Sequence, residues 1–208
     1  MQTLFDYIVE ILKMNTISGV YKYILVSFTL TFIITGSVII IGYLMNQFEQ
    51  WQMKLLSKVF GQRFANFICN KLTFIGTIIH ECSHALFVVL TGAKLLRIKC
   101  ITLFNKTELG YVEFKTRGRK PMQMIQLSLV SCAPVVMGLI LNSIFITLLL
   151  TNTYSLWITV IGWYLVVSIF DHMSMSMVDI TNYCKGLLFI APCLFTIFMF
   201  LQYISVNV

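Results

Sequence analysis

The residues of this chain best suited to chemistry are two histidines and a glutamate in the apolar stretch IIHECSHALF, residues 78–87. His80 and His84 are four positions apart, so on a helix they share one face and can bind one zinc ion through their ring nitrogens. Glu81 has the position of the general base in the H-E-x-x-H pattern. Zinc lowers the pKa of a bound water toward neutrality, and a neighbouring carboxylate can then accept and deliver its protons. The pattern therefore predicts a hydrolytic zinc site.

The same three residues also permit a purely structural interpretation. His80 and His84 can form hydrogen bonds between helices, with Glu81 neutral or paired to a lysine. Ionisable groups inside a bilayer cost several kcal/mol and persist where they pair, bind an ion or line a water-filled cavity. The chain has only three histidines, and the third, His172, follows Asp171. This concentration favours the metal site.

A catalytic zinc ion usually takes three protein ligands and leaves one position open for water. The third ligand is expected in FDHMSMSMVDITNY, residues 170–183, the polar stretch with suitable side chains. Asp179 is the preferred ligand, because Asp171 and His172 adjoin each other at the end of a span, where a solvated helix end also explains them. His172, Ser176 and Asp179 share a helical face by their spacing, so His172 and Ser176 are candidates to contact Asp179 or the substrate.

Composition shows which elements must position these residues. The chain has 208 residues, is 58% hydrophobic and 11% charged, and has a mean hydropathy of +0.86, which indicates an integral membrane protein rather than a soluble domain. We predict an all-α polytopic fold with about five transmembrane helices. The expected spans are residues 23–45, 72–93, 125–150, 155–170 and 187–206.

The whole chain, residues 1–208, is expected to form a single membrane-embedded domain. Residues 1–71 supply the first span and an interfacial amphipathic helix at 47–70, residues 72–186 the catalytic core, and residues 187–208 the last span. Eight lysines and arginines between residues 94 and 120 place that segment in the cytoplasm. The net charge of +7 is interpreted as topology and membrane-surface charge, without a nucleic-acid partner. The plasma membrane is the expected location of this multi-pass protein.

One departure from helix is predicted after the H-E-x-x-H segment. Apolar and basic residues alternate after Gly92 and again after a turn-like segment at 105–110, which predicts a membrane-associated β-hairpin over residues 95–117. Its expected apolar face includes Leu96, Ile98, Val112 and Phe114. The six cysteines contain no C-x-x-C pair and predict neither a disulfide framework nor a thiolate zinc site.

From about residue 75 to residue 186 the chain resembles the site-2 proteases, zinc metalloproteases that cut substrates within or next to the membrane. The resemblance rests on HECSH in a hydrophobic helix, on Gly92, on a hairpin ending in GYV at 110–112, on Ala133-Pro134, and on an aspartate in a later helix. It implies a zinc-dependent endopeptidase with one zinc ion per chain and a membrane-anchored peptide or protein as substrate. It further implies His80, His84 and Asp179 as zinc ligands and Glu81 as the catalytic base.

Two motifs depart from the family pattern. Many members carry glycine after the third ligand, whereas Ile180 follows Asp179 here. Many also have Gly-Pro-x-x-Asn in the middle helix, where this chain has APVVM at 133–137, so Asn142 would have to replace the asparagine that stabilises the oxyanion. An asparagine within a membrane helix is, however, more often an interhelical hydrogen-bonding residue than a catalytic group, and Asn142 has this alternative.

Three other functions share these residues. One is a membrane metal-binding or transport protein, in which the candidate ligands line an ion path. A second is a catalytically inactive relative that acts as a membrane chaperone or immunity factor. A third is a peptidase acting on soluble peptides at the membrane surface.

Overall fold

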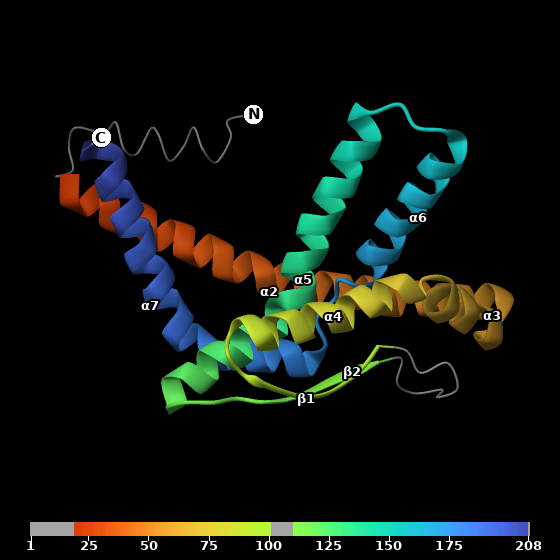
Figure 1. Cartoon of the computed structure of the whole chain (residues 1–208), viewed down its shortest axis with the longest axis horizontal. Coiled ribbons are helices and arrows are strands. Elements are labelled where there is room, and N and C mark those ends of the chain that lie inside the picture. Colours follow the sequence, from red (N-terminus) through yellow and green to blue (C-terminus); the bar gives the residue numbers. More distant parts are fainter. Residues whose placement is uncertain (1–18, 101–109, 208) are drawn as a thin grey trace. The chain divides into compact units, whose positions relative to one another are not determined.

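The computed structural model describes residues 19–100 and 110–207, and most of them are helical (Figure 1). Seven helices and two strands follow one another along these residues. Their bounds are α2 Gly19–Phe60, α3 Gln62–Asn66, the π-helix η1 Phe67–Leu72, α4 Phe74–Leu90, β1 Lys94–Lys99, β2 Tyr111–Lys115, α5 Lys120–Thr151, α6 Leu156–His172 and α7 Met177–Asn207.

The chain divides into two compact units, Met1–Ser37 with Leu187–Val208, and Val38–Gly186. In the first unit the side chain of Gln202 donates a hydrogen bond to the Ser27 hydroxyl at 2.8 Å. This hydrogen bond between polar side chains links the apolar helices α2 and α7. The second unit contains every candidate site residue.

Three of the described helices are long and apolar enough to cross a membrane, which indicates a membrane protein. They are the segments Val20–Phe60, Lys120–Thr151 and Met177–Ile204. The pair Gln62–Leu72 and Phe74–Leu90, bent by 54° at its break, adds a fourth span if it crosses as one. The predicted number of about five is therefore not confirmed. The missing span is α6, whose 17 residues reach only about 26 Å against a hydrocarbon core of about 30 Å.

The first predicted span does not stop before a separate interfacial helix. Instead α2 continues for 42 residues and ends at Phe60, because Gly61 takes a left-handed φ of 84°. The segment from Gln47 onward is thus mostly a continuation of α2. This continuation carries polar side chains of α2 to the site described below.

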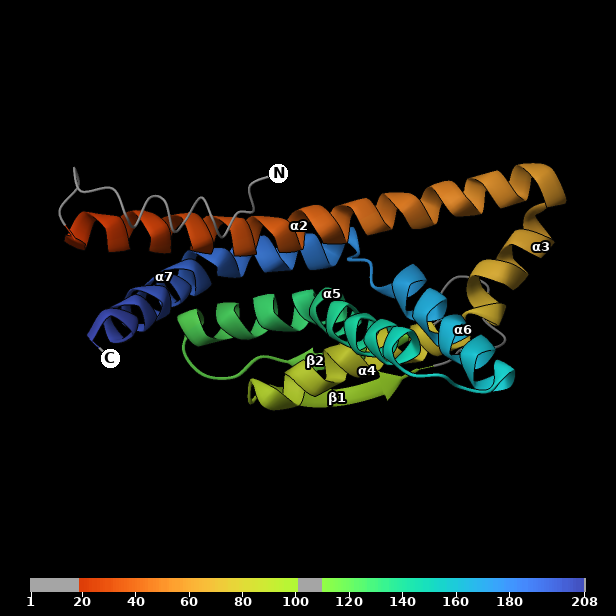
Figure 2. The same cartoon turned by 90° about the horizontal axis from the view of Figure 1, so that it is seen from above.

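The predicted hairpin exists as two antiparallel strands, in register from Lys94 opposite Lys115 to Lys99 opposite Tyr111. Figure 2 shows the strands alongside α4. A register irregularity between Leu95 and Arg97 changes which side chains face inward.

The inward residues pack against the helices behind the hairpin. Leu95, Val112 and Phe114 contact a buried cluster of Val88, Ala93 and Val130. Leu96 and Ile98, expected on the apolar face, are 55% and 41% exposed. The prediction was wrong for Leu96, which falls at the irregularity, whereas Ile98 stays opposite Val112 on the predicted apolar face.

Close packing of α4 against α6 brings the histidines together. A Cβ atom at Gly76 would meet the backbone carbonyl of Ser168, so only glycine permits this approach. The Ser168 hydroxyl accepts a hydrogen bond from the Gly76 amide at 2.8 Å and donates one to the Thr73 carbonyl at 2.9 Å. His80 and His172 each lie one helical turn beyond this contact, and they consequently meet.

Candidate functional site

The two imidazoles of the H-E-x-x-H motif face each other on α4. Their Nε2 atoms are 3.2 Å apart, and the ring planes are inclined by 75°. The Nδ1 atom of His80 lies 2.7 Å from the His172 carbonyl oxygen, and that of His84 lies 2.8 Å from the Val130 carbonyl oxygen. Both rings are therefore held from outside the helix that carries them.

These contacts determine where the ring protons lie. A carbonyl oxygen only accepts hydrogen bonds, so each Nδ1 carries a proton, and in the neutral rings both Nε2 atoms are acceptors. Two acceptors 3.2 Å apart repel unless a proton or a cation lies between them. Two nitrogen ligands of a tetrahedral zinc ion, each about 2.0 to 2.1 Å from the metal, would be separated by roughly 3.3 Å. His80 and His84 thus fit two adjacent positions of a zinc site.

Glu81 lies between the histidines in sequence and is 8% exposed. Its side chain packs against Gly110, the residue that leads into β2. A Cβ atom at Gly110 would lie 2.7 Å from Glu81 Cγ and 2.9 Å from the Lys99 carbonyl oxygen. Glycine is required here by close approach, and the start of β2 is consequently held against the candidate base.

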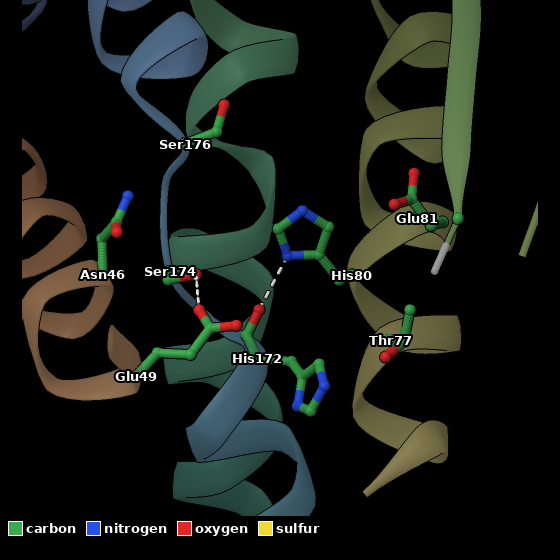
Figure 3. A pocket seen from close by; sticks show the side chains of 9 residues that line it. Asn46, Glu49, Thr77, His80, Glu81, His172, Ser174 and Ser176 are labelled. Carbon is green, nitrogen blue, oxygen red and sulfur yellow. Dashed lines mark hydrogen bonds between the residues drawn. The ribbon is translucent and has the colours of Figure 1, made fainter. Parts of the chain in front are cut away.

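A cavity of about 250 Å³ opens beside His80 and Glu81 (Figure 3). Eight of its nine lining residues have polar side chains, and they come from four parts of the unit. The lining residues are Asn46, Glu49, Thr77, His80, Glu81, Gly110, His172, Ser174 and Ser176. A polar cavity of this size beside Glu81 and His80 can hold water molecules.

The contribution of α2 to this cavity was not predicted from the sequence. Asn46 donates a hydrogen bond to the Met175 carbonyl at 2.7 Å, and Glu49 accepts one from the Ser174 hydroxyl at 2.9 Å. The Gly42 carbonyl also accepts a bond from the Met175 amide at 3.3 Å. Gly42, Asn46 and Glu49 are spaced by four and three residues, so they share one face of α2. This spacing is the sequence pattern that could have predicted their common role.

The structure does not bring Asp179 together with the two histidines. The Asp179 carboxylate accepts hydrogen bonds from the Ser176 amide and hydroxyl, while the Ser176 hydroxyl accepts one from the Asp179 amide at 3.1 Å. This is a reciprocal cap at the start of α7. Within residues 19–100 and 110–207, no three His, Cys, Asp or Glu side chains gather closely enough to hold a metal ion. Ser176 itself lines the cavity.

His172 is the last residue of α6, and Asp179 lies on α7, so the predicted single helical face is wrong. The residues between them, 173–176, are not helical and redirect the chain. The His172 ring is 3.3 Å from the Ser168 carbonyl oxygen through Nδ1, and its buried Nε2 has no hydrogen-bond partner among the described residues. Its clearest contribution is its backbone carbonyl, which orients His80.

Asp171 is 5% exposed and lies near the side chain of Gln52 on α2. A solvated helix end is therefore not its environment.

Asn142 lies on α5 and is 7% exposed. Its amide nitrogen is 3.9 Å from the Met173 sulfur, and its amide oxygen has no partner in the described part of the chain. Asn142 does not line the cavity beside His80 and Glu81. The structure thus places it against the segment that follows α6.

Comparison with known proteins adds no further assignment: no protein family, no curated protein and no solved structure matches this chain significantly.

Proposed function

We propose that this chain is a zinc-dependent endopeptidase of the site-2 protease type, acting on a membrane-anchored peptide or protein. The observation that carries the proposal is the pair of Nε2 atoms 3.2 Å apart, with both Nδ1 atoms held by backbone carbonyls, beside a buried glutamate. Backbone acceptors of this kind are typical of metal-binding histidines, because they hold the tautomer and the ring orientation. A merely structural histidine pair has no need for two facing acceptors.

When bound, zinc supplies an activated water and polarises the scissile carbonyl. His80 and His84 would hold it, and we assign the third ligand to Asp179, which would exchange its contacts with Ser176 for the metal. Glu81 accepts a proton from the attacking water and delivers it to the leaving amine. Packing against Gly110 restricts the Glu81 side chain and so helps to hold its carboxylate in position.

The hairpin gives the substrate a place to bind. A transmembrane helix hides its peptide carbonyls in its own hydrogen bonds, so it must unwind before hydrolysis. Each strand of the two-stranded sheet keeps one edge without a strand partner in the described residues. An unwound substrate can add to such an edge, and β2 begins beside Glu81. We further propose about five crossings, with α6 completing its span through flanking residues, in the plasma membrane.

Glu81→Gln is the direct test. Glutamine keeps the size of the side chain and cannot accept the proton, so the variant should retain zinc and lose cleavage of a membrane-anchored substrate. A Glu113→Gln variant on the exposed hairpin surface serves as the matched control and should cleave normally. Full cleavage by Glu81→Gln would exclude the proposed role.

An inactive relative remains the second candidate, because Asp179 caps α7 rather than joining the histidines. This alternative predicts no zinc in the purified chain. It also predicts that wild type and Glu81→Gln behave alike in every assay.

A further inference from the structure

Two cysteines from separate elements meet beside the candidate base. The sulfur of Cys82, the residue after Glu81 on α4, lies 3.9 Å from the sulfur of Cys100, which follows β1. Cys82 is exposed and Cys100 is half-buried. The two thiols are already in contact, and neither lines the cavity.

We propose that Cys82 and Cys100 form a reversible disulfide that responds to a peroxide. A disulfide bond of about 2.0 Å requires the two sulfur atoms, now 3.9 Å apart, to approach by roughly 2 Å. The other cysteines are differently placed. Cys69 and Cys132 are buried, while Cys184 and Cys193 are exposed on α7.

The reaction proceeds in two balanced steps. One thiol sulfur attacks the peroxide, whose O–O bond breaks, and the products are a sulfenic acid and one water. The second thiol then displaces the sulfenic oxygen as a second water, and the S–S bond forms. The two thiols together lose two electrons to hydrogen peroxide. A dithiol reductant reverses the reaction by thiol–disulfide exchange.

The position of the bond connects it to the site. Lys99, next to Cys100, pairs with Tyr111, and its carbonyl oxygen lies against Gly110, which packs on Glu81. A bond from Cys100 to Cys82 therefore fixes this end of the hairpin to the helical turn that carries the base. Under the proposed function, on which this consequence rests, substrate addition beside Glu81 requires the hairpin end to yield, so the oxidised chain should cleave more slowly.

The test treats the full chain in detergent with hydrogen peroxide, digests it with trypsin under non-reducing conditions, and analyses the peptides by mass spectrometry. Peptides 72–94 and 100–106, which carry Cys82 and Cys100, should appear as one linked species that dithiothreitol separates. Cys100→Ser should abolish the linked species, whereas the matched variant Cys184→Ser should retain it. Separate peptides, or links mainly to Cys184 or Cys193, would overturn the proposal.

Cleavage is measured on the same samples. Peroxide should lower the activity of wild type severalfold, dithiothreitol should restore it, and Cys100→Ser should stay active under peroxide. Equal cleavage by the linked and reduced wild-type chains would overturn the regulatory consequence. If no sample cleaves any substrate, the proposed function fails, yet the linked peptide still decides whether the disulfide forms.

Discussion

The proposed zinc site depends on which ring nitrogen atoms of His80 and His84 are left without a hydrogen-bond donor role. Backbone carbonyl oxygens accept hydrogen bonds from both Nδ1–H groups, and the two Nε2 atoms face each other at 3.2 Å. This arrangement favours a shared cation over a hydrogen bond between neutral rings. Asp179 is the residue whose role differs most between the sequence and the structure, because it caps a helix here.

The ligand and cap roles of Asp179 can be separated with Ser176. Ser176→Ala removes the hydroxyl that caps α7 and should lower the free energy of unfolding by about 1 kcal/mol, with zinc content unchanged. Asp179→Ala should lower stability similarly and also lose zinc. Thermal unfolding and metal analysis of both variants check this prediction. Equal zinc content in Ser176→Ala and Asp179→Ala would show that Asp179 caps α7 and is not a zinc ligand.

Gly110 offers a second prediction at this scale. Gly110→Ala places a methyl group 2.7 Å from Glu81 Cγ and 2.9 Å from the Lys99 carbonyl oxygen, so the base or the strand must shift. We expect cleavage to fall at least tenfold, because small displacements of catalytic groups are costly, while zinc stays bound. Glu113→Ala, which removes an exposed contact with Arg97, is the control and should have little effect. Unchanged cleavage by Gly110→Ala would show that the contact between the hairpin and Glu81 is not needed for cleavage.

At the scale of elements, the contact between α4 and α6 holds the site together. Gly76 and Ser168 bring the helices into backbone contact, one turn from His80 and His172. The segment after α6 is held in turn by Asn46 and Glu49 of α2. The geometry of the histidines therefore depends on packing between helices that are distant in sequence.

Gly76→Ala tests this dependence. The added methyl group meets the Ser168 backbone, which cannot rotate away, so α4 and α6 should separate and His80 should lose its carbonyl partner. We expect a loss of stability of about 1 to 3 kcal/mol and weaker zinc binding. Gly36→Ala, another helical glycine with nothing within 4 Å of the added atom, should be neutral or slightly stabilising. Equal unfolding temperatures would contradict the account of the interface.

Sequence predicted the local features of this site and missed the long-range ones. The motif helix and hairpin follow from residue spacing within short windows, and both are present as elements. The irregularity after Leu95 and the contact of Glu49 with Ser174, 125 residues away, depend on packing that no local pattern encodes. The helix cap formed by Ser176 and Asp179 could have been predicted from the sequence, because Ser-x-x-Asp before an apolar run is a helix-start pattern.

At the scale of the whole molecule, the unequal distribution of lysine and arginine predicts orientation. Eight of these residues lie between residues 94 and 120, just before and at the start of α5, which is long and apolar enough to span a membrane. The hairpin and the candidate base beside it would face the cytoplasm, where thiols are kept reduced. A peroxide-sensitive disulfide would there form only under oxidative conditions.

Labelling from one side tests this orientation. In a chain whose native cysteines are replaced by serine, Lys115→Cys and Asn152→Cys lie beyond opposite ends of α5. A membrane-impermeant maleimide added to intact cells should label Asn152→Cys and leave Lys115→Cys unlabelled until the cells are opened. Labelling of Lys115→Cys in intact cells would reverse the orientation, and labelling of both would exclude α5 as a span.

Metal analysis of the purified chain shows whether the two facing histidines hold a zinc ion. Inductively coupled plasma mass spectrometry is applied to wild type, His80→Ala and His84→Ala in detergent, with His172→Ala as a histidine control outside the ligand pair. We expect one zinc ion per chain in wild type and in His172→Ala, and its loss in both motif variants. Wild-type protein without zinc after reconstitution, or motif variants that keep it, would contradict this expectation.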